Sequence, residues 1–141
     1  MEIIKIFGFQ AGIDKKIPLF TMSVSAGIPV PSNSDIENEV DLNEFLIEHP
    51  AATFFAKVKG KEMQDIGIFD GDILIVDTCI EPKDSKVVVV SIQGVLTVKI
   101  YRLIEGEVFL QSYSNQFLPM RIEPYMEFVL LGVVTKIIHT L

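Results

Sequence analysis

From residue 53 onward, short runs of β-branched and aromatic residues alternate with clusters of glycine, aspartate and proline. This spacing is typical of antiparallel strands joined by tight turns. Gln93-Gly94 and Glu105-Gly106 are expected to form hairpin turns. The predicted strands are Thr53–Val58, Ile73–Asp77, Lys86–Ile92, Val95–Leu103, Glu107–Gln111, Met120–Glu123 and Glu127–Ile138. We therefore expect a mainly β fold, a curled antiparallel sheet or partly closed barrel.

One short helix is predicted over Asp41–His49. Asp41 and Glu44 form a pair that resembles a capping box. Apolar residues follow from Leu42 at helical spacing, and Pro50 ends the segment.

Residues 1–34 carry no sustained hydrophobic period and are rich in glycine and proline, which disfavours both a helix and a central strand. Their middle, Ile17–Ala26, is apolar and rich in small residues, unlike a disordered tail. Two interpretations stay open for this segment: an edge strand packed on the core, or a peptide docked as a substrate. We expect an extended N-terminal arm over residues 1–40 and a folded domain over residues 41–141.

Composition narrows the class of protein. The net charge of −7 argues against a free-standing nucleic-acid binder. Cys79 is the sole cysteine, which excludes an intrachain disulfide and fits a reducing compartment. The mean hydropathy of +0.41 is high, but the longest apolar run, Phe128–Val134, is far shorter than the roughly 20 residues of a membrane span. With no secretory signal recognised at the N-terminus, we expect a cytoplasmic oligomer with no membrane partner.

Common catalytic and metal-binding patterns are not predicted. His49, expected at the helix end, and His139 are assigned structural places, so no Ser-His-Asp triad is expected. Cys79 and the two histidines are far apart in sequence, so neither a metal site nor a cofactor is expected. Asp70 and Asp72 are interpreted as residues of a turn and not as a metal or glycosidase pair.

The sequence allows two interpretations of the role of Lys99. On the predicted strand it shares a face with Val95, Thr97 and Tyr101. A lysine in this place either extends its ammonium to solvent or is held in apolar surroundings. In the second case its charged form is disfavoured, and it becomes a general base.

Four motifs are spread along the chain: DLNEFLIEHPAATFFAKVKG at residues 41–60, GIFDGDILIVD at 67–77, LTVKI at 96–100 and LGVVTKII at 131–138. The stretch Lys57–Asp77 is expected to form a strand, a glycine turn, a helical turn, a second turn and a strand. Through these motifs the whole chain resembles the UmuD and LexA family of self-cleaving Ser/Lys peptidases. The separations between Gly27, position 62 and Lys99 also match those between the family's cleavage site, nucleophile and lysine.

The resemblance implies a fold, an activity and partners. The fold is that of the LexA C-terminal domain. The activity is self-cleavage between Ala26 and Gly27 by a serine, with Lys99 as general base. The partners are a second copy in a homodimer, the RecA filament on single-stranded DNA that stimulates cleavage, and a UmuC-type Y-family polymerase for error-prone translesion synthesis in the SOS response. No direct nucleic-acid binding is implied.

The chain departs from the family at the nucleophile, because Glu62 stands at the serine position. The nearest hydroxyls in sequence are those of Thr53 and Thr78. We expect an ion pair between Glu62 and Lys99 that keeps the lysine charged and leaves the chain without cleavage activity. Two alternatives stay open: an enzyme with another nucleophile, and the dimerisation domain of a phage LexA-like repressor that lacks its DNA-binding half.

Overall fold

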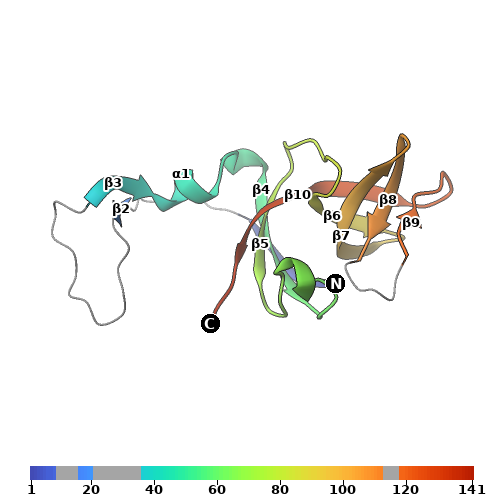
Figure 1. Cartoon of the computed structure of the whole chain (residues 1–141), viewed down its shortest axis with the longest axis horizontal. Coiled ribbons are helices and arrows are strands. Elements are labelled where there is room, and N and C mark those ends of the chain that lie inside the picture. Colours follow the sequence, from blue (N-terminus) through green and yellow to red (C-terminus); the bar gives the residue numbers. More distant parts are fainter. Residues whose placement is uncertain (9–15, 21–35, 113–117) are drawn as a thin grey trace. The chain divides into compact units, whose positions relative to one another are not determined.

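The computed structural model describes residues 1–8, 16–20, 36–112 and 118–141, and Figure 1 traces them along the chain. The strands are β1 (Glu2–Gly8), β2 (Lys16–Phe20), β3 (Ile36–Asp41), β4 (Thr53–Lys59), β5 (Ile73–Asp77), β6 (Val87–Ile92), β7 (Val95–Ile104), β8 (Glu107–Gln111), β9 (Met120–Arg121) and β10 (Phe128–Ile138). The helices are α1 (Leu42–Leu46) and two 3-10 turns, η2 (Pro50–Ala52) and η3 (Gln64–Ile66).

Eight strands form one antiparallel sheet in the order β1-β4-β5-β10-β6-β7-β8-β9. The sheet curls because Glu2 of β1 also pairs with Thr97 of β7, which confirms the predicted curled sheet. The long strand β10 pairs with β6 over its first half and with β5 over its second half (Figure 1). A Cβ at Gly132, between these halves, would lie 2.7 Å from the Val76 side chain, so the close approach of β10 to β5 requires glycine.

The chain divides into two compact units. The first comprises residues 1–9 and 49–141 and holds the large sheet; the second comprises residues 10–48 and holds α1 and the pair β2–β3. The expectation that residues 1–34 lack regular structure is wrong for β1, which pairs along β4 from Glu2 to Gly8. The predicted domain boundaries, 1–40 and 41–141, remain a prediction.

The helix is shorter than predicted. Asp41 caps its N-terminus, since its carboxylate accepts a hydrogen bond from Asn43 N at 2.9 Å. The helix ends at Leu46, and Ile47 already has extended backbone angles. His49, predicted at the helix end, instead precedes η2, because the residue before Pro50 is driven out of the helical region. Within the described ranges, no helix has the length and apolarity to cross a membrane.

The core lies on both faces of the curled sheet, and β6 contributes to each face. Val88, Val89 and Val90 are all fully buried. Val89 belongs to a cluster with Val58 and Met63, whereas Val88 and Val90 pack with Leu110 and Val133. Successive residues of a strand point to opposite faces, so a run of valines joins the two clusters.

We predict that Met63→Ala lowers the free energy of unfolding by about 2–5 kcal/mol, because it removes a fully buried side chain and leaves a cavity. Met120→Ala is the control, since Met120 is 37% exposed, and it should cost about 1 kcal/mol or less. Urea denaturation followed by circular dichroism measures both. Equal losses in the two variants would contradict the position of Met63 in the core.

Candidate functional site

Position 62 lies in the loop that joins β4 to β5. Gly60 opens this loop with a φ of 123°, a conformation that suits glycine, and its N–H donates to Asp70 Oδ1 at 2.8 Å. At the far side of the loop, Gly71 N donates to the Val58 carbonyl at 2.9 Å. These bonds and the buried Met63 place Glu62 at the edge of the sheet with its carboxylate folded over Gly60.

The two aspartates of this loop serve its structure, as predicted. Asp70 accepts from Gly60, as above, and Asp72 is buried. The Asp72 carboxylate accepts from Phe69 N at 2.8 Å and also contacts His139 Nδ1 at 2.5 Å. Both carboxylates are therefore engaged in closing the loop and in fixing the C-terminal end of the domain.

Glu62 and Lys99 line one cavity of about 270 Å³. Lys99 reaches it from β7, and Leu110 and Ser112 reach it from the end of β8. The other lining residues are Met1, Leu118 and Met120. The fold thus brings the sequence-predicted lysine and position 62 to one concave site, although they come from different elements.

Lys99 is partly buried where it lines the cavity. Its ammonium donates to Ser112 Oγ at 2.6 Å. Burial lowers the pKa of Lys99 below its ordinary value, and the nearby Glu62 carboxylate opposes this shift. Desolvation outweighs the attraction of the anion. This favours the second interpretation of Lys99, while its role as a general base stays a prediction.

The expected ion pair between Glu62 and Lys99 does not form among the described residues. Lys99 makes its hydrogen bond to Ser112, and Glu62 Oε2 lies 3.7 Å from the α-amino nitrogen of Met1. The Glu62 side chain is 43% exposed, so solvent screens its charge. Glu62 therefore acts on Lys99 through space, without a direct contact.

Ser112 is the site residue that the sequence analysis missed. It follows β8, and the neighbouring cross-strand pair is Ile100 with Gln111. This register sets Ser112 beside Lys99 on one face of the sheet, and the Ser112 residue is only 6% exposed. The sequence did predict two strands joined by a hairpin at Glu105-Gly106. The register of that hairpin would have placed the Ser112 hydroxyl beside Lys99.

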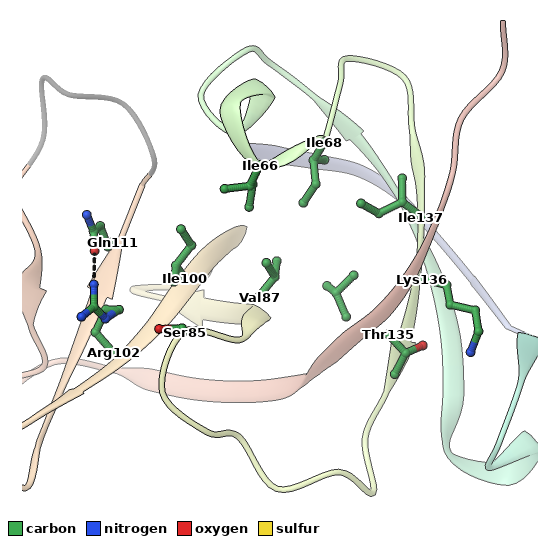
Figure 2. A pocket seen from close by; sticks show the side chains of 11 residues that line it. Ile66, Ile68, Ser85, Val87, Ile100, Arg102, Gln111, Thr135, Lys136 and Ile137 are labelled. Carbon is green, nitrogen blue, oxygen red and sulfur yellow. Dashed lines mark hydrogen bonds between the residues drawn. The ribbon is translucent and has the colours of Figure 1, made fainter.

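A larger cavity of about 490 Å³ lies on the opposite face of the same strands. Figure 2 shows aliphatic side chains converging on it, among them Ile66, Ile68 and Ile100. Arg102 also lines it and donates to Gln111 Oε1 at 3.1 Å (Figure 2). Because most of the side chains that line this cavity are aliphatic, it offers a largely apolar surface for binding.

The predicted cleavage site cannot be placed against this geometry. Ala26 and Gly27 lie outside the described residues. Their assignment as the scissile pair therefore stays a prediction from the sequence motif.

Comparison with known proteins supplies the family context for these residues. A family model described as Peptidase S24-like matches residues 18–135. The chain is 37% identical to protein ImpA of Salmonella typhimurium over 86% of its length and 83% of that protein. It is 34% identical to protein SamA of Salmonella typhimurium over 92% and 90% of the two chains. With protein MucA of Escherichia coli, the identity is 36% over 84% and 82%.

We predict that Glu62→Gln lowers the pKa of Lys99 further, because the substitution removes the anion that opposes the effect of burial. NMR titration of selectively labelled lysine side chains measures this shift. Glu107→Gln is the matched control, since Glu107 pairs with Arg121 and not with Lys99. A Lys99 signal that titrates together with the exposed lysines in the parent chain would contradict the assignment of a desolvated base.

Proposed function

The chain belongs to the Peptidase S24-like family, and we propose that it is a UmuD-like factor of SOS mutagenesis whose self-cleavage is suppressed by Glu62. The family match bears out the resemblance to UmuD and LexA found in the sequence motifs. The proposal gives the chain a binding role: a dimer that acts with a Y-family polymerase in translesion DNA synthesis.

The observation that carries the proposal is the meeting of Lys99 and Glu62 in one cavity. The cavity holds Lys99 with a lowered pKa and, at the serine position of the family, Glu62. In the family reaction, the neutral lysine takes the serine proton while the serine oxygen attacks the carbonyl carbon of the Ala26–Gly27 bond. A glutamate has no hydroxyl proton to give up, and attack by its carboxylate would form an anhydride. With Glu62 in place of the serine, Lys99 therefore has no hydroxyl proton to accept at this position.

The proposed dimer is supported by the exposed apolar side chains of β10. Val129, Ile137 and Ile138 are 54%, 39% and 41% exposed, respectively. Such residues on one long strand suit packing across a two-fold axis. The acidic net charge of −7 suits a chain that meets DNA through its protein partners, namely the polymerase and the RecA filament.

A second candidate function, self-cleavage with Ser112 as the nucleophile, is favoured by one contact. The Lys99–Ser112 hydrogen bond of 2.6 Å already joins a hydroxyl to the base inside the cavity. In this reaction the Ser112 oxygen would bond to the scissile carbonyl carbon as its proton passes to Lys99. We rank it second because Ser112 is almost fully buried, which restricts the approach of a peptide.

We predict that Glu62→Ser restores cleavage and yields a fragment that begins at Gly27. The protein is incubated at mildly alkaline pH or with a RecA filament on single-stranded DNA, and the products are read by mass spectrometry. Below the pKa of Lys99, the rate should rise about tenfold per pH unit, because only the neutral lysine accepts the proton. A folded Glu62→Ser variant that stays intact under both conditions would refute the assignment.

Two controls separate the candidates. Glu62→Ala removes the carboxylate without adding a nucleophile, so it should stay intact, as should Glu62→Ser combined with Lys99→Ala. If the parent chain cleaves itself and Ser112→Ala stops that cleavage, the second candidate replaces the first.

A further inference from the structure

A cluster of three polar side chains lies apart from the cavity, around the end of β5. One ring nitrogen of His49, one carboxylate oxygen of Asp77 and the Sγ of Cys79 lie within 4.8 Å of one another. Among the described residues, these three form the one group of histidine, cysteine and acidic side chains gathered closely enough to hold a metal ion. Neither the family match nor the proposed cleavage chemistry uses them.

Backbone pairing brings these residues together. Thr53, at the start of β4, is in register with Asp77, at the end of β5. His49 lies just before Thr53, and its carbonyl accepts from Thr53 Oγ1 at 2.6 Å. Cys79 lies just beyond Asp77, and its N–H donates to Asp77 Oδ1 at 2.8 Å. The two segments that flank one cross-strand pair therefore turn toward the same point.

The Asp77 carboxylate fixes the orientation of the histidine ring. Its side chain is 3% exposed, and its Oδ2 lies 2.6 Å from His49 Nδ1. A buried carboxylate at this distance accepts a hydrogen bond from Nδ1–H, so in neutral His49 the lone pair lies on Nε2. A carboxylate behind an imidazole is the arrangement that orients histidine ligands and raises their basicity in metal sites.

The chemistry of the His49 and Cys79 side chains indicates which class of cation they would bind. An imidazole nitrogen and a thiolate favour Zn²⁺ and similar transition metals over Mg²⁺ and Ca²⁺, which take oxygen ligands. Two donors on such a cation lie about 3.5 Å apart. The His49 side chain is 42% exposed and Cys79 is exposed, so both can adjust and both can be reached from solvent.

We propose that His49 Nε2 and Cys79 Sγ bind a divalent transition-metal cation of the Zn²⁺ class, with Asp77 as the residue that positions His49. Water completes the coordination, and the Cys79 thiol releases its proton when the cation binds. The expectation from sequence that no metal site can form considered only distances along the chain. The pairing of β4 with β5 removes that separation. This site does not depend on the proposed function.

The chain contains an internal control for the site. His139 Nδ1 lies 2.5 Å from Asp72 Oδ1, and the exposures of 47% and 1% nearly equal those of the His49–Asp77 pair. The His139 ring lies 5.4 Å from that of Phe69. A His–Asp pair without the neighbouring thiol should hold no cation of this class.

Titration of the full chain with Co²⁺ under reducing conditions tests the proposal. We expect an absorption band from thiolate-to-cobalt charge transfer that saturates at one cation per chain and disappears when Zn²⁺ is added. Cys79 is the sole cysteine, so such a band identifies it as a ligand. Zn²⁺ should also raise the melting temperature of the parent chain.

Three variants and one control complete the test. Cys79→Ser should lose the band, and His49→Gln and Asp77→Asn should weaken Co²⁺ binding about 10–100-fold, whereas His139→Gln should bind as the parent does. Since the Asp77 side chain is buried, the surface variants at His49 and Cys79 decide the outcome if Asp77→Asn does not fold. The absence of a band, a band indifferent to His49→Gln, or saturation at half a cation per chain would overturn the proposal.

Discussion

The pairing of β4 with β5 is the constraint on which both candidate sites depend. At one end of this hairpin, the register of Thr53 with Asp77 brings His49 and Cys79 to a common point. At the other end, the loop that closes the hairpin presents Glu62 to the cavity. One set of backbone hydrogen bonds thus places both candidate sites, because the register of β4 with β5 fixes where the segments at each end of the hairpin lie.

The chemistry of the cavity is a balance between burial and charge at Lys99. Burial favours the neutral amine, and the Glu62 carboxylate favours the ammonium; burial has the larger effect on the pKa. Ser112 holds the amine at 2.6 Å. Because Glu62 stands where we expect the serine of the family, we propose a binding role for this peptidase fold.

Much of the fold could be predicted from hydrophobic alternation. The strands Ile73–Asp77 and Glu107–Gln111 have the predicted bounds, and both hairpin turns with glycine occur as expected. Two expectations were wrong. β1 was missed because residues 1–34 show no sustained hydrophobic period, whereas pairing with β4 makes this segment a strand. His49 was placed at the end of the helix because apolar residues at helical spacing lead up to it, whereas the helix ends at Leu46.

By itself, the sequence determined the fold class and the family, because local periodicity and motifs are properties of neighbouring residues. It also singled out Lys99 and Glu62 as the candidate residues of the site. The tertiary structure decided what those residues touch. It replaced the expected Glu62–Lys99 ion pair by a Lys99–Ser112 hydrogen bond, and it gathered His49 with Cys79. Contacts between strands depend on register and on burial, and neither is encoded in the spacing of any single segment.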